Sequence, residues 1–207
     1  MNTEIKLNEK LFENCSGAVL AVSGGPDSMA MLDLFRKHIS HIPFVCATFN
    51  HGLRDEADDE VEGVRKYCLD FAIRFETAKE NIADSLPQAT SIEEHARNRR
   101  YAFLENIKLK YGYSHIVTAH NADDNAESFL MNLTRGCGID GLCGIREIRN
   151  DNNTVRPLLR YTKQELLDYC KINSVPYWLD KSNNDTGFDK CGSIENSRDK
   201  YRIDFFK

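Results

Sequence analysis

The sequence has no long apolar run, no paired cysteines and no internal repeat, and each absence excludes a class of protein. A membrane-spanning helix needs about 20 consecutive, mostly apolar residues, and no such stretch occurs in the chain. The polar start, residues 1–10, also lacks the apolar core of a secretory signal. We therefore expect a cytoplasmic protein without a membrane partner.

The seven cysteines are odd in number and include no C-x-x-C pair. Several lie within apolar runs, such as residues 44–47. We interpret them as small buried hydrophobic residues, and the alternative is a metal site or an iron–sulfur cluster. The set comprises Cys15, Cys46, Cys68, Cys137, Cys143, Cys170 and Cys191.

The net charge of −5 argues against a protein that coats nucleic acid unspecifically. RNA binding, however, needs only a local positive surface. Arginines gather in residues 97–100 and again in 135–160, whereas acidic residues gather in 55–62. The arginines either form such a surface or belong to solvated helix faces.

The apolar pattern predicts an α/β domain. Short apolar runs bounded by turn residues predict strands, and apolar residues at helical spacing predict helices between them. Strands are expected at residues 17–22, 43–49, 73–77, 114–119 and 154–158, and helices at 27–38, 56–71, 91–110, 123–134 and 162–173. This alternation predicts a Rossmann-like, doubly wound, mostly parallel five-stranded sheet with helices on both faces.

The most informative segment lies between the first expected strand and the first expected helix, and its sequence is Ser23-Gly24-Gly25-Pro26-Asp27-Ser28. A helix start offers free N–H groups and a favourable dipole to phosphate. Gly24 and Gly25 permit close approach of the backbone, and Pro26 fits the first turn, where its missing N–H costs nothing. The two serines add hydroxyl donors, and Asp27 is suited to hold a metal ion. The alternative is a plain Gly-Gly turn.

This segment is neither a Walker A loop nor a dinucleotide fingerprint, because it lacks the Gly-Lys-Ser/Thr ending of the first and the G-x-G-x-x-G of the second. It resembles the S-G-G-x-D-S signature of the PP-loop ATP pyrophosphatases. The resemblance implies ATP and Mg²⁺ as cofactors. It also implies adenylation of a carbonyl oxygen, release of pyrophosphate, and expulsion of AMP by a nucleophile.

Three later segments resemble one branch of that superfamily, the tRNA(Ile)-lysidine synthetases. They follow expected strands or the helix next to them, and ligands bind at the carboxyl ends of parallel strands. They are residues 49–54 (FNHGLR), 118–127 (TAHNADDNAE) and 135–142 (RGCGIDGL). The family forms are N-H-x-L-R, H-x-x-D-D-x-x-E-T and R-G-x-G-x-x-G-L, so Ser128 stands where threonine is usual.

The second of these segments carries the expected catalytic groups. Asp124 and Glu127 are three residues apart, so their carboxylates share one face of a helix, and His120 lies just before that face. Such a group can bind Mg²⁺ together with Asp27, orient an amine, or accept its proton. Arg100 is expected to stabilise negative charge on the triphosphate or on the adenylated intermediate.

Structural alternatives exist for three of the residues in these segments. Asp123 and Asp124 can simply cap the helix that they open. His51 is either a nucleotide-binding residue at the end of the second strand or a structural histidine.

The resemblance implies that the substrates are free L-lysine and tRNA(Ile) with a CAU anticodon. ATP would activate the C2 oxygen of the wobble cytidine, and lysine would then attack C2 to give lysidine. Because anticodon loops are single-stranded, the cytosine can turn out of its stack to reach the enzyme. The sequence does not set the oligomeric state, and a dimer is one option.

The sequence predicts a catalytic domain over residues 1–186 and an atypical tail over 187–207. The family continues beyond Asp180-x-Ser182-Asn183-x-Asp185 with an aromatic residue and then Arg-Asn, followed by another arginine. This chain keeps Phe188 but has Lys190-Cys191, and Ile194 stands in the place of the later arginine. The tail is either a non-native product of truncation or frameshift, or part of a minimal variant with altered RNA recognition.

Two other functions fit the same loop. One is another PP-loop tRNA modification such as 2-thiolation, which commonly uses paired cysteines. The other is a degenerate nucleotide- or RNA-binding remnant that does not turn over.

Overall fold

The computed structural model describes residues 5–53, 56–87, 90–138, 143–149 and 153–179. The expectations for Arg54, for residues 139–142, for the 180–185 motif and for the 187–207 tail lie outside these ranges. None of the helices within them combines the length and the apolar character required to cross a bilayer.

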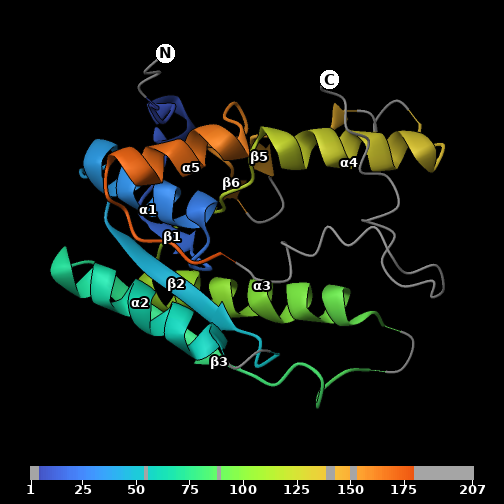
Figure 1. The fold of residues 1–207 in the computed structure, drawn as a ribbon, viewed down its shortest axis with the longest axis horizontal. Coiled ribbons are helices and arrows are strands. Elements are labelled where there is room, and N and C mark those ends of the chain that lie inside the picture. The colour runs from blue at the N-terminus through green and yellow to red at the C-terminus, as the bar shows by residue number, and fades with distance from the viewer. Residues whose placement is uncertain (1–4, 54–55, 88–89, 139–142, 150–152, 180–207) are drawn as a thin grey trace.

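A central sheet carries helices on both faces (Figure 1), which confirms the predicted α/β class. A short 3₁₀ helix, η1 (Glu9–Phe12), precedes it. The strands are β1 (Ala18–Ala21), β2 (Phe44–Asn50), β3 (Arg74–Lys79), β4 (His115–Val117), β5 (Ile148–Arg149) and β6 (Thr154–Val155). The helices are α1 (Pro26–His38), α2 (Glu56–Asp70), α3 (Ile92–Tyr111), α4 (Ala122–Thr134) and α5 (Lys163–Ile172).

The sheet order is β3-β2-β1-β4-β6-β5, and every neighbouring pair is parallel except β5 with β6. Five strands were expected, and the described residues form six. The additional strand, β5, has two exposed residues and pairs antiparallel with β6. A strand so short and exposed has no apolar periodicity, so the sequence pattern cannot reveal it.

The core divides into two layers because side chains alternate between the faces of each strand. Leu20 of β1 packs on the face that α1, α2 and α5 cover, whereas its neighbour Val19 packs on the opposite face against Leu104 and Ile107 of α3. The helix α4 buries none of its residues fully. It begins just after β4 and extends away from the sheet (Figure 1).

The cysteines follow the prediction only in part. Cys46, Cys68 and Cys170 are buried, but Cys143 is exposed. Cys15 and Cys137 are half-buried, and Cys191 lies outside the described ranges.

Candidate active site

A pocket of about 840 Å³ lies at the carboxyl ends of β1, β2 and β4. The chain crosses from β1 to β2 on one side and reaches β4 on the other, so this is the point where the strand order reverses and where doubly wound folds bind ligands. Of the predicted site residues, all but Gly24 line the pocket: Ser23, Gly25, Pro26, Asp27, Ser28, His51, Arg100, His120, Asp124 and Glu127.

The loop between β1 and α1 is held by its own hydrogen bonds. Gly24 has a φ of +94°, which favours glycine, and Gly25 and Pro26 occupy the N-cap and N1 positions of α1. The Ser28 hydroxyl accepts from the N–H groups of Ser23 and Gly24, each at 3.2 Å, and donates to the Gly25 carbonyl at 2.9 Å. The N–H groups of Asp27 and Ser28, in the first turn of α1, have no partner within the helix and can bind an anion.

Asp27 is half-buried beside this loop with one oxygen unsatisfied. Its Oδ2 accepts from Asn121 Nδ2 at 3.1 Å, and its buried Oδ1 has no hydrogen-bond partner among the described residues. Burial raises the pKa of Asp27 to about 6; Lys163 opposes this rise, and the negative charge of Asp124 adds to it. A cation bound at this carboxylate would offset its negative charge.

Asp124 both caps α4 and faces the pocket. Its carboxylate accepts from Asn121 N–H at 3.1 Å while Asn121 accepts from Asp124 N–H at 2.9 Å, a reciprocal capping box. The neighbouring Asp123 turns elsewhere and accepts from the Lys163 N–H at 2.7 Å, at the start of α5. The capping alternative therefore holds for Asp124, which also lines the pocket, whereas Asp123 contacts the start of α5 instead of capping α4.

His120 lies among arginines on the same wall. Its Nδ1 is 2.9 Å from the Thr118 hydroxyl. The pKa of His120 is lowered to about 4, chiefly by burial and also by the positive charges of Arg156, Arg100 and Arg97, against the opposing charge of Asp124. The imidazole is therefore neutral at pH 7. It can exchange hydrogen bonds with a ligand but holds a proton only weakly.

Arg97, Arg100 and Arg156 form a group that we call the arginine wall. The partners described for these side chains are neutral: the Tyr101 ring lies under Arg97 and Arg100, and the Arg146 carbonyl accepts from Arg156 Nη1 at 2.8 Å. Arg156 is only 5% exposed, and its buried Nε has no partner among the described residues. A bound anion would offset the charge of Arg156, because a buried charge without a counter-ion is costly.

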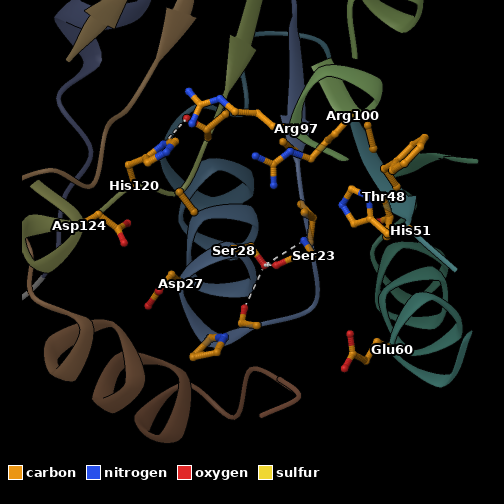
Figure 2. A pocket seen from close by; sticks show the side chains of 18 of the residues that line it. Ser23, Asp27, Ser28, Thr48, His51, Glu60, Arg97, Arg100, His120 and Asp124 are labelled. Carbon is orange, nitrogen blue, oxygen red and sulfur yellow. Dashed lines mark hydrogen bonds between the residues drawn. The ribbon is translucent and has the colours of Figure 1, made fainter. Parts of the chain in front are cut away.

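His51 lies on the opposite flank of the loop from His120 and Asp124 (Figure 2). Its ring packs against Phe49 with centroids 4.9 Å apart, and burial lowers its pKa, with Arg100 adding to the effect. Its buried Nδ1 has no partner among the described residues. His51 is thus packed as a structural histidine while one ring nitrogen remains able to bind a ligand.

The pocket residues that were not predicted as site residues include Arg156, Lys163 and Trp178. Arg156 closes a buried strand, and its position in the pocket follows only from the pairing of β4 with β6. Lys163 enters the site because α5 packs against α1. Trp178 follows α5 and returns to the loop, where its N–H donates to the Gly24 carbonyl at 2.9 Å.

A known protein family and several known proteins match this chain in sequence. The pattern of the PP-loop domain family matches residues 1–192. The tRNA(Ile)-lysidine synthase of Chlorobaculum tepidum is 40% identical over 186 residues, which cover 88% of this chain and 56% of that protein. The corresponding enzyme of Clostridium tetani is 36% identical over 169 residues, covering 80% of this chain and 36% of that protein. The chain thus spans about half or less of the length of these relatives.

A solved structure is similar in fold. The U34-tRNA thiolase NcsA from Methanococcus maripaludis matches with a TM-score of 0.70 at 18% identity, over 84% of this chain and 62% of that one. At this identity the likeness concerns the fold alone. The family pattern, by contrast, covers nearly the whole sequence and includes the loop, so the chain belongs to the PP-loop domain family.

Proposed function

We propose that this chain binds ATP at the PP-loop and uses it to attach free lysine to C2 of the wobble cytidine of tRNA(Ile) with a CAU anticodon. In the first step the C2 oxygen of cytidine displaces pyrophosphate from the α-phosphorus. In the second, the lysine ε-nitrogen forms a bond to C2, the C2–O bond breaks, and AMP leaves with that oxygen. ATP binding follows from the family, and the choice of substrates rests on the relatives and the motifs.

One observation carries the proposal: a single pocket presents carboxylates and the arginine wall around a helix N-terminus. The N–H groups at the start of α1 suit the phosphates. The arginine wall suits the negative charge of the adenylated intermediate or of the RNA backbone. Asp124 and Glu127 suit the ammonium group of lysine. The proposed reaction needs a binding site for each of these groups: the phosphates, the anionic intermediate or RNA backbone, and the lysine ammonium.

The donor set also fits Mg²⁺. Magnesium in nucleotide sites is usually held by one or two carboxylates together with phosphate oxygens and water, and the free, buried Oδ1 of Asp27 lies close enough to Asp124 for their charges to interact. The described residues form no cluster of three or more protein ligands, so phosphate and water would complete the shell. We propose that Asp27 and Asp124 hold the ion, which would neutralise charge on the leaving pyrophosphate.

The low pKa of His120 limits the roles that it can have in the reaction. The lysine ammonium must lose a proton before it attacks, and its ordinary pKa is about 10. With a pKa of about 4, His120 is neutral and has no charge that attracts the lysine ammonium, whereas the carboxylates of α4 attract it. We therefore assign His120 to hydrogen bonding with the base or the intermediate. Proton removal falls to a carboxylate of α4, with Glu127 the more exposed of the two.

The test incubates the 207-residue chain with ATP, Mg²⁺, radiolabelled lysine and a tRNA(Ile) transcript with a CAU anticodon. The expected result is lysine in the RNA with equal amounts of AMP and pyrophosphate, and none with a matched transcript that has uridine at the wobble position. ATP binding without lysine transfer would overturn the proposal in favour of the remnant. Transfer of sulfur from an added donor would overturn it in favour of 2-thiolation.

Glu127→Gln separates nucleotide binding from lysine transfer. Because Glu127 belongs to α4 and not to the loop, we expect unchanged ATP affinity by calorimetry but a fall in lysine transfer of about 100-fold, the scale of a lost general base. Asn132→Ala, on the same helix outside the pocket lining, serves as the control. An unchanged transfer rate in Glu127→Gln would remove this residue from the mechanism.

A further inference from the structure

The segment after α5 is tied to the PP-loop. The chain leaves α5 at Ile172, buries Val175, and reaches the loop at Trp178. There the Trp178 N–H donates to the Gly24 carbonyl at 2.9 Å. Gly24 itself does not line the pocket. Its carbonyl accepts the hydrogen bond from Trp178, and this bond holds the loop against a distant part of the chain.

The indole of Trp178 lies between the loop and α2. A Cβ at Gly24 would be 3.4 Å from Trp178 Cε3, in ordinary contact. A Cβ at Gly63, in the middle of α2, would overlap the indole ring, with Cε2 at 2.9 Å and two other ring atoms closer still. Glycine in a helix interior is unfavourable relative to alanine, so this position is explained by the ring that fills the space.

This contact sets one wall of the pocket. Ala57, Glu60 and Val61 of α2 line the pocket on the side of the indole, and Trp178 and Leu179 line it as well. The indole thus packs against α2 next to Glu60 and Val64, whose side chains also lie close to Gly24 of the loop. Figure 2 shows Glu60 of α2 across from Ser23 and Ser28 of the loop.

We propose that Trp178 is a positioning residue for ATP. Its N–H fixes the carbonyl of Gly24, and its ring packs against Gly63 and helps to hold α2 in place relative to the loop. One wall of the nucleotide pocket is therefore formed before ATP binds. A site ordered in advance binds more tightly, because less ordering accompanies binding. This inference rests on the proposed ATP binding and adds the residue that shapes the pocket.

Gly63→Ala tests the contact without changing Trp178. Alanine favours the helix, so a purely local effect would leave ATP binding intact. If the indole is a spacer, the added methyl displaces it, and we expect the Kd for ATP to rise about tenfold. Lys66→Ala, an exposed change on the same helix, is the matched control and should bind ATP like the unaltered protein.

The double variant Gly63→Ala/Trp178→Ala separates spacing from general damage. With the ring removed, the methyl group has nothing to displace, so the double variant should bind ATP no more weakly than Trp178→Ala alone. Trp178→Phe should recover part of the affinity. In turnover assays the KM for ATP should rise while kcat and the KM for lysine stay near their original values, which a mere loss of folded protein would not produce.

Trp178 is the only tryptophan in the chain, so its fluorescence reports on this wall directly. We expect an emission change that saturates with ATP at the Kd that calorimetry gives. ATP binding by the unaltered protein with equal affinity in Gly63→Ala and Trp178→Ala, or additive losses in the double variant, would overturn the inference. Absence of ATP binding in the unaltered protein would instead overturn the proposed function.

Discussion

Two aspartates on α1, six positions apart, lie in opposite environments. Asp33, near the end of the helix, is 1% exposed and accepts from Tyr67 and Tyr169, each at 2.7 Å, and from Arg36 and Lys37. Burial alone would raise its pKa, but these four partners outweigh burial and hold the pKa at about 2. Asp33 therefore joins α1 to α2 and α5 as a satisfied anion.

Asp27, at the start of the same helix, has one amide partner and a buried oxygen without any. Burial raises its pKa to about 6. Both carboxylate oxygens of Asp33 thus have partners. Asp27, in the lining of the pocket, has one oxygen without a partner among the described residues. A group kept in an unfavourable state by its surroundings is a candidate for ligand binding, so the contrast on one helix favours Asp27 over Asp33 as a binding residue.

The largest expected effect comes from Asp27→Asn. The amide keeps the size of the side chain and can still accept from Asn121, but it cannot hold a cation, so we expect ATP-dependent pyrophosphate release to fall by about 1000-fold or more. A variant with normal pyrophosphate release would show that the incomplete carboxylate is not part of the site.

The same variant should be more stable. The folded pKa of about 6 lies above the ordinary value of 3.8, so the protonated form stabilises the fold below pH 3.8, and this stability is lost as pH rises through 6. Asparagine does not ionise, so the variant avoids this loss of stability. At pH 7.5 we expect a gain of about 1–3 kcal/mol in the free energy of unfolding, at about 1.4 kcal/mol for each pH unit between the two values. Urea unfolding at pH 5 and 7.5 measures it.

An intermediate effect is expected at the arginine wall. Arg156→Gln should weaken tRNA-dependent turnover about tenfold to 100-fold, because charge-assisted hydrogen bonds to an anion are lost, with ATP affinity nearly unchanged. It should also raise the pKa of His120, since Arg156 is the charge that lowers it most. The Cε1 proton of His120 in NMR spectra reports this directly. An unmoved titration would place Arg156 too far from His120 to act on it.

The smallest effect on activity is expected from Asp33→Asn, whose consequence lies in stability. Asparagine cannot accept from all four partners, so we expect a loss of about 2–4 kcal/mol at pH 7, while ATP affinity of the folded protein is retained. The folded pKa of about 2 lies below 3.8, so the contribution of Asp33 is present above pH 3.8 and is lost as pH falls through 2. The stability difference between the two proteins should therefore shrink in acid.

The parts of this molecule that are contiguous in sequence were predictable, and those that depend on packing were not. The alternation of strands and helices is a local pattern and is confirmed in the structure. The loop and the acidic start of α4 are also local patterns, and both line the pocket. The two tyrosine partners of Asp33 come from α2 and α5, and no local sequence pattern predicts them. Within α1 the residue merely interrupts an apolar stripe.

One sequence signal was available for the contact behind the loop. Gly63 interrupts an otherwise helical segment, and such a glycine often marks a close packing contact. The ring that meets it lies far along the chain, so the sequence indicates a small residue but not its neighbour. The arrangement of Arg156 is similar, because its place in the pocket depends on which strand lies beside β4.

The Ser28 hydroxyl already occupies two of the loop's N–H groups. These hydrogen bonds hold the loop in shape. A nucleotide that takes those groups must exchange hydrogen bonds with a resident side chain instead of adding new ones, and such exchanges contribute little net enthalpy. Affinity for ATP then depends chiefly on the helix dipole and on the cations and anions arranged around it, so it should be sensitive to ionic strength.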